Sequence, residues 1–159
     1  MSAAAQLSLH SPVGDISITE EEGFLVSIDW GWGRDQSSTP LLKEAARQLN
    51  AYFDSTLTKF DLPLKPIGTK FQKSVWKEML KIPYGRTLTY GNIASRLNSA
   101  PRAVGGACGR NNLPILIPCH RVLGANDALV GYTADGGVAT KTTLLILEGK
   151  DIQLPQLNL

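Results

Sequence analysis

Residues 89–110, TYGNIASRLNSAPRAVGGACGR, hold two short helical patterns with a turn between them. Thr89 is placed to cap the first helix, which covers residues 90–97. The segment NSAP, residues 98–101, has turn chemistry, and its proline suits the first position of a second helix that ends near Gly109. Two short helices joined by such a turn predict a helix-turn-helix.

The second of these helices is unusual because residues 102–110 are mostly Gly and Ala. A helix that reads bases normally presents Asn, Gln, Arg or Lys to the major groove. Each glycine inside a helix costs about 1 kcal/mol relative to alanine, which suggests a demand for close approach. The partner would be a nucleic-acid backbone or narrow groove, or alternatively the protein's own core. Arg102 and Arg110 flank this small surface and could meet phosphates or probe the base stack.

The N-terminal part alternates apolar and polar residues, which predicts a small antiparallel sheet. Turn residues separate three such stretches, at 6–10, 16–18 and 24–30. A helix then begins after Thr39 and repeats apolar residues at helical spacing as far as Phe53. Residues 60–64 suggest one further short strand.

Prolines and a glycine near residues 63–68 mark a linker, which divides the chain into 1–66 and 67–159. The second part opens with a helix that starts from a capping box at Thr69. It closes with an amphipathic helix over residues 138–148. The predicted fold class is α+β, with a small N-terminal antiparallel sheet-and-helix domain followed by a helical domain of the winged-helix or helix-turn-helix kind.

Charge is distributed unevenly along the 159 residues, although the net charge is only +2. Residues 1–65 hold five Lys/Arg against nine Asp/Glu, whereas residues 66–159 hold eleven against five. This asymmetry suggests that the second part meets a polyanion; the alternative is a solvated basic face without a partner.

Other classes of protein are disfavoured by composition. No apolar run approaches the roughly 18 residues of a membrane helix, and the first residues do not resemble a secretory signal. Only Cys108 and Cys119 are available for disulfides, so a secreted fold that depends on disulfide bonds is disfavoured. A cytoplasmic location is expected instead.

A thiol, a base and a cation are consecutive in PCHRV, residues 118–122. The apolar run 115–117 that precedes them predicts a buried strand. The thiolate is the nucleophilic form of cysteine, and a neighbouring base or positive charge promotes it. Cys119 is therefore a candidate nucleophile and His120 its candidate base, acting directly or through a water. Glu148 is one candidate to orient the histidine. The alternatives are a cysteine that only packs in the core, a histidine on the surface and a solvated glutamate at a helix end.

Residues 71–149 resemble the DNA-binding domain of the O6-alkylguanine-DNA alkyltransferases, also called methylated-DNA–protein-cysteine methyltransferases. The matching segments keep the family's order and nearly its spacing over about half the chain. They are TYGNIA (89–94), RAVGG (102–106), Asn111, PILIPCHRV (114–122), Gly131-Tyr132, Leu144-Leu145 and Glu148-Gly149. The first part resembles the family's variable N-terminal domain only loosely.

The resemblance implies direct reversal of O6-alkylguanine damage in double-stranded DNA, without a cofactor. Cys119 would accept the alkyl group once, His120 would be the water-mediated base, and Glu148 would orient it. Tyr90 would help to rotate the nucleotide out of the duplex and donate a hydrogen bond to the guanine. Arg102 would fill the gap left in the base stack.

The family's remaining site residues also have counterparts here. Asn111 would brace the active-site turn, and Val122 would offer its backbone carbonyl to the guanine amino group. Tyr132 would line the pocket, and Thr133 would be a backbone donor to the O6 position. The small helix would lie in the minor groove, and a monomer would bind without sequence preference. Its contact residues would be Ala103, Gly105 and Gly106.

Two features depart from the family pattern. The loop over residues 131–137, which would close over the base, is about two residues longer than usual. Cys108 stands on the predicted recognition helix, where it could pack or be a second alkylation site. The spacing of His10, Cys108, Cys119 and His120 does not match a zinc site, so none is expected.

Three other functions compete with suicidal alkyl transfer. One is recognition of alkylated lesions without their removal, although relatives of that kind lack a cysteine at the acceptor position. Another is a winged-helix transcription regulator, which the Gly/Ala helix disfavours. The third is a cysteine hydrolase that uses Cys119, His120 and Glu148 through many turnovers.

Overall fold

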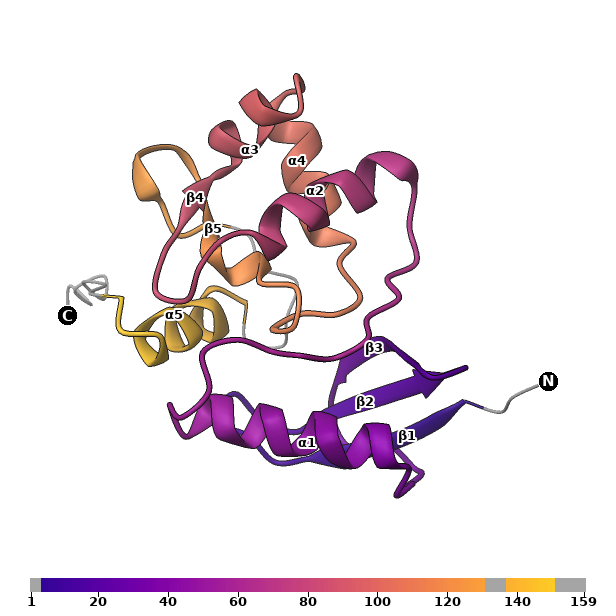
Figure 1. Ribbon diagram of the computed structural model, residues 1–159. Coiled ribbons are helices and arrows are strands. Elements are labelled where there is room, and N and C mark those ends of the chain that lie inside the picture. The colour runs from indigo at the N-terminus through magenta and orange to yellow at the C-terminus, as the bar shows by residue number, and fades with distance from the viewer. Residues whose placement is uncertain (1–3, 131–136, 151–159) are drawn as a thin grey trace.

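The structure is a computed structural model that describes residues 4–130 and 137–150. Figure 1 shows its elements in two neighbouring groups. The first group is a three-stranded antiparallel sheet in the order β1-β2-β3, with α1 packed against β1 and β2. This confirms the predicted sheet and helix. The elements are β1 (Ala5–Leu9), β2 (Ile16–Glu21), β3 (Phe24–Trp30) and α1 (Pro40–Phe53).

Local sequence explains where α1 begins and which side it buries. The Thr39 side chain accepts a hydrogen bond from the Leu42 amide at 3.1 Å, and Pro40 occupies the first helical position. Leu49 and Tyr52 are buried on the same face. The C-terminal end of α1 is the end that lies beside α5 (Val138–Leu147) in Figure 1.

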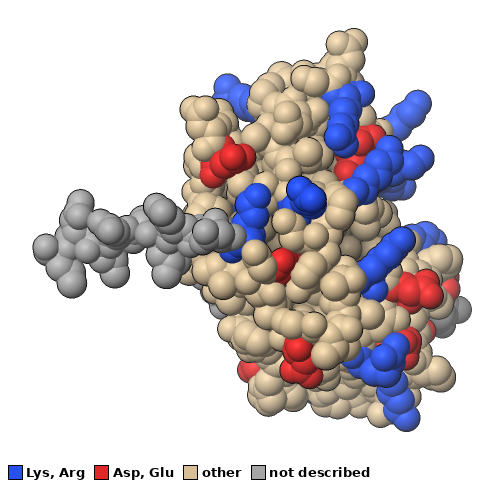
Figure 2. All heavy atoms as spheres, turned by 60° about the vertical axis from the view of Figure 1, so that its left-hand side comes forward, with Lys and Arg blue, Asp and Glu red and all other residues tan. Residues whose placement is uncertain are grey.

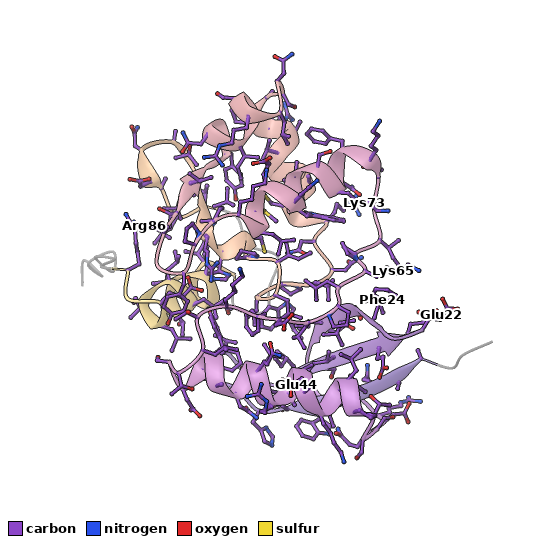
Figure 3. The ribbon with its side chains drawn as sticks, in the orientation of Figure 1. Glu22, Phe24, Glu44, Lys65, Lys73 and Arg86 are labelled. Carbon is purple, nitrogen blue, oxygen red and sulfur yellow. The ribbon has the colours of Figure 1, made fainter. Side chains whose placement is uncertain are left out.

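The strand predicted over residues 60–64 is wrong. Among the described residues, this segment makes one isolated bridge, to Leu25 in β3. Leu25 donates from its amide to the Pro63 carbonyl at 2.9 Å, but a proline has no N–H to return to a ladder. Lys65 then lies over the ring of Phe24, with its Nζ 5.7 Å from the ring centroid (Figure 3). The segment therefore follows the edge of β3 and leads into α2.

The second group contains the predicted helix-turn-helix. Its helices are α2 (Lys70–Leu80), α3 (Tyr90–Arg96) and α4 (Pro101–Gly109). Both α2 and α3 start from capping boxes, at Thr69 and at Thr89. The α4 helix packs on both α2 and α3, and Trp76 of α2 donates from its indole nitrogen to the Ala107 carbonyl at 2.9 Å.

The apolar run 115–117 is buried, as predicted, but it is a turn rather than a strand. Ile115 has φ +74°, a conformation that a β-branched residue rarely adopts. Pro114 and Pro118 flank the run, and neither can donate to a ladder. The turn closes instead through the Ile117 amide, which donates to the Leu113 carbonyl at 2.8 Å.

Short elements follow this turn and complete the second group. They are the 3₁₀ turn η1 (Cys119–Arg121), β5 (Val122–Leu123), the 3₁₀ turn η2 (Ala125–Asp127) and α5. The β5 strand pairs in parallel with β4 (Leu88–Thr89). One hydrophobic core runs through both groups. Within the described ranges, the chain has no helix with the length and hydrophobicity needed to cross a membrane.

Candidate functional site

Cys119 and His120 lie in η1, one short turn that continues directly into β5. Because β5 pairs with β4, this turn lies close to the start of α3, where Tyr90 follows Thr89. Cys119 is 6% exposed and His120 is fully buried. The alternative that His120 is a surface residue is therefore wrong.

Glu148, the C-cap residue of α5, lies against His120, with Nε2 and Oε2 2.7 Å apart. It is 4% exposed, so the alternative of a solvated helix end is also wrong. Burial alone would raise the pKa of Glu148. Hydrogen bonds from His120, Arg121 and Tyr52 outweigh burial and lower this pKa to about 2.

The ionised carboxylate fixes the tautomer of His120. A carboxylate only accepts, so Nε2 of His120 must carry the hydrogen that it shares with Glu148. The other ring nitrogen, Nδ1, is buried and has no hydrogen-bond partner among the described residues. Burial lowers the pKa of His120, although Glu148 opposes this effect. The histidine is thus neutral at pH 7, with the lone pair of Nδ1 available as a base.

Three further residues hold Glu148 in place. Arg121 donates to both carboxylate oxygens, from Nε at 2.8 Å and from Nη2 at 3.0 Å. The Gly85 amide donates to Oε1 at 3.3 Å, and Tyr52 of α1 donates to Oε2 at 2.5 Å. Sequence reasoning missed all three as site residues. Arg121 had a signal, since it follows the Cys-His pair, whereas the other two are far from that motif in sequence.

Tyr90 lies near both thiols and near a buried lysine. Its hydroxyl is 3.5 Å from the Val130 carbonyl, which also accepts a hydrogen bond from Lys141 Nζ at 3.0 Å. Burial, followed by the charges of Cys108 and Cys119, raises the pKa of Tyr90 to about 12. Lys141 is fully buried, with its Nζ 5.7 Å from the Tyr90 ring centroid, and was not foreseen from the sequence.

Asn111 and Val122 flank the active-site turn on either side. Asn111 donates from Nδ2 to the Ile117 carbonyl at 2.9 Å and accepts from the Leu113 amide at 2.9 Å, so it closes the buried turn that precedes Cys119. Val122 is buried in β5, opposite Leu88. Tyr132 and Thr133 lie outside the described residues.

The small face of α4 is open to solvent. Arg102, Ala103, Gly106 and Arg110 are exposed, and Gly105 is half-buried. A Cβ atom added at Gly105 or Gly106 would meet no atom of the described chain within 4 Å. The alternative that these glycines pack against the protein's own core is therefore wrong. In the view of Figure 2, Lys and Arg side chains are spread over the upper and right-hand parts of the surface, with Asp and Glu side chains among them.

Cys108 belongs to the inner side of α4. It is 7% exposed, and its Sγ lies 3.4 Å from the sulfur of Met79. Burial, followed by the charge of Cys119, raises the pKa of Cys108 to about 12, while Lys141 lowers it. This environment favours packing over reactivity. Among the residues that the structure describes, no group of three or more His, Cys, Asp or Glu side chains could hold a metal ion.

Two family models match this chain in succession. The model of the 6-O-methylguanine DNA methyltransferase ribonuclease-like domain matches residues 7–66, and that of the DNA binding domain matches residues 70–150. A methylated-DNA–protein-cysteine methyltransferase of Methanosarcina acetivorans is 44% identical over 149 residues, covering 87% of this chain and 94% of that protein. The constitutive Bacillus subtilis enzyme of that name is 43% identical over 151 residues, covering 87% and 91%.

Solved structures agree with these matches. The crystal structure of Mycobacterium tuberculosis OGT in complex with DNA superposes with a TM-score of 0.81 at 39% identity, covering 91% of this chain and 92% of that chain. The two family models together span both element groups and the turn that carries Cys119. The chain therefore belongs to the 6-O-methylguanine DNA methyltransferase family.

Proposed function

We propose that this protein repairs O6-alkylguanine in double-stranded DNA by transferring the alkyl group, once per molecule, to Cys119. One observation carries the proposal: Cys119 shares a turn with His120, which is paired with the buried Glu148, and this turn adjoins a helix-turn-helix whose second helix exposes small residues. The site thus combines a nucleophile, a base and a surface that fits a narrow groove.

His120 is the base in this proposal. Its Nδ1 lone pair takes the proton of the Cys119 thiol through a water, because Nε2–H is already committed to Glu148. Glu148 stabilises the imidazolium that forms, and Arg121 keeps the carboxylate ionised. The family role of Glu148 as orienter is supported by this geometry.

The transfer itself is a displacement at the alkyl carbon. A bond forms between Cys119 Sγ and that carbon while the bond from the carbon to guanine O6 breaks. The electron pair leaves with the guanine as its N1/O6 anion, which is then protonated. The thioether product is not reduced by thiols, so each protein molecule reacts once.

DNA binding follows from α4 and its charges. The face of Ala103, Gly105 and Gly106 lies in the minor groove, and phosphate contacts bind the duplex without sequence preference. The lesion is flipped into the site, at a cost of a few kcal/mol. Arg102, exposed at the start of α4, fills the gap in the base stack.

The remaining pocket roles complete the proposal. Tyr90 helps to rotate the nucleotide and donates to the guanine, and the Val122 carbonyl accepts from its amino group. Tyr132 lines the pocket, and the Thr133 amide donates to O6. The protein acts as a monomer in the cytoplasm, or on the nucleoid if its source is bacterial, and residues 1–66 and 67–159 are its two domains.

The test is to mix the protein with a duplex that contains one O6-methylguanine and to record the intact protein mass with peptide mapping. The proposal requires one methyl group on Cys119, saturating at one per protein. Cys119→Ser should gain no mass and still bind the duplex. Tight binding without mass change in the wild type would instead support the recognition-only alternative. Many turnovers on an ester would support the hydrolase.

A further inference from the structure

A hydroxyl group from the N-terminal part of the chain reaches the proposed active site. Tyr52, in the last turn of α1, donates to Glu148 Oε2 at 2.5 Å, although the two residues are 96 positions apart. Tyr52 is 1% exposed and Glu148 is 4% exposed, so solvent does not compete for this hydrogen bond. Nothing in the proposed chemistry so far requires this tyrosine.

Tyr52 shares its acceptor atom with the base. Glu148 Oε2 accepts from Tyr52 at 2.5 Å, from His120 Nε2 at 2.7 Å and from Arg121 Nη2 at 3.0 Å. Three donors on one oxygen divide its negative charge among them. The strength with which Glu148 holds the imidazole therefore depends on how much of that charge the phenol takes.

The phenol is protonated and can only donate here. Burial, followed by the charge of Glu148, raises the pKa of Tyr52 above its usual value. Its ring packs against three aromatic neighbours, with centroids 5.4 Å from Phe53, 5.2 Å from Phe60 and 6.2 Å from Tyr84. The hydroxyl is thus a fixed donor rather than a mobile one.

We propose that Tyr52 is a positioning residue for alkyl transfer: its hydroxyl anchors Glu148 Oε2 and so controls how that carboxylate holds His120. The proposal rests on the proposed function of Cys119 and His120. It gives the N-terminal part a role in the reaction without any contact with the substrate. Tyr52 acts through Glu148 on His120 and then on the thiol.

The other charged and polar groups around His120 and Glu148 are unchanged in Tyr52→Phe. Arg121 from η1 and Lys141 from α5 are the cations that act on His120, and Tyr84 contributes a second phenol. The Tyr84 hydroxyl donates to the Leu147 carbonyl at 3.2 Å rather than to the carboxylate. Tyr84→Phe is therefore a matched control, because it removes a neighbouring hydroxyl of the same kind.

The first measurement is the single-turnover rate of methyl transfer against pH for full-length wild type, Tyr52→Phe and Tyr84→Phe. Without the phenol, Glu148 holds protonated His120 more strongly, so the acid limb for Tyr52→Phe should move to higher pH. The transfer rate on the plateau above the acid limb should fall about three- to tenfold, because Glu148 loses one buried hydrogen bond that holds it in position. Tyr84→Phe should keep the wild-type profile. Superimposable profiles for wild type and Tyr52→Phe would overturn the proposal.

The second measurement does not depend on transfer. The chain has two histidines, His10 and His120, so an NMR titration of labelled imidazoles can follow the buried His120 separately from His10. The His120 titration should move to higher pH in Tyr52→Phe and stay in place in Tyr84→Phe. An unchanged or opposite shift overturns the role of Tyr52, whereas failure of wild-type transfer alone counts against the proposed function.

Discussion

His120 Nε2 lies 2.7 Å from Glu148 Oε2, and both residues are buried. Folding lowers the pKa of each, so the unfolded chain binds protons more readily than the folded one in acid. The contribution of His120 is present above pH 6.5, its ordinary pKa, and is lost as the pH falls below that value. That of Glu148 is present above 4.5 and is lost as the pH falls toward about 2.

The free energy of unfolding should therefore fall in two stages during acidification. The stage that belongs to Glu148 should amount to about 3 kcal/mol. Urea titrations at a series of pH values measure both stages. His10→Ala, which removes the exposed histidine, should leave the upper stage unchanged. A free energy of unfolding that stays constant between pH 7 and pH 5 would contradict the buried neutral histidine.

Asn111 should stabilise both the fold and the active-site turn. Asn111→Ala removes the acceptor of the Leu113 amide and one of two donors to the Ile117 carbonyl, which keeps the Cys119 amide, and this should cost about 1–3 kcal/mol of unfolding free energy. Methyl transfer should slow as well, because this turn leads directly into Cys119. The exposed neighbour gives a matched control, since Asn112→Ala should change neither quantity. Equal effects of the two substitutions would mean that the amide does not brace the turn.

Helix starts and the reactive pentapeptide could be predicted from the sequence because their signals are local. Thr69 and Thr89 cap their helices through residues only three positions away. The run 115–117 could not be assigned in this way, since three consecutive apolar residues indicate burial but carry no periodicity that identifies the backbone conformation. The prolines on either side of it were the signal that favoured the turn.

Site residues that are distant from the Cys-His pair in sequence could not be predicted from local sequence patterns. Tyr52 shares the buried face of α1 with ordinary core residues, and only the packing of α1 beside α5 makes it a partner of Glu148. Gly85 has φ +76°, and a Cβ there would lie 3.1 Å from the Glu148 carbonyl oxygen. The α2 helix already ends at Leu80, with Lys81 as its C-cap, so helix termination does not explain this glycine.

Cys108 should remain unmodified when Cys119 reacts. It is buried against Met79, and burial is the main reason that its pKa is raised to about 12, so almost no thiolate exists at neutral pH. Cys108→Ala should gain the same single methyl group as wild type from a methylated duplex. Intact mass with peptide mapping gives the answer. A second methyl in wild type that disappears in Cys108→Ala would identify Cys108 as another acceptor.

A substitution at Gly106 tests whether α4 has small side chains because a binding partner approaches it closely. Gly106→Ala should raise the free energy of unfolding by about 0.5–1 kcal/mol, because the added Cβ improves helix propensity and meets no described atom. If α4 lies in a narrow groove, the same methyl should weaken duplex binding by about fivefold or more, the cost of overpacking a tight contact. Urea unfolding and fluorescence anisotropy with an undamaged duplex measure the two effects.

The control for Gly106→Ala is Asn50→Ala, an exposed position on α1 that also gains helix propensity. It should raise stability slightly and leave duplex affinity unchanged. Opposite signs of the stability and binding effects at Gly106, together with no binding effect at Asn50, would show that the glycine is kept for contact rather than for folding. Unchanged affinity in Gly106→Ala would remove α4 from the DNA interface, because an exposed methyl group in the middle of that helix could not avoid a groove that encloses it.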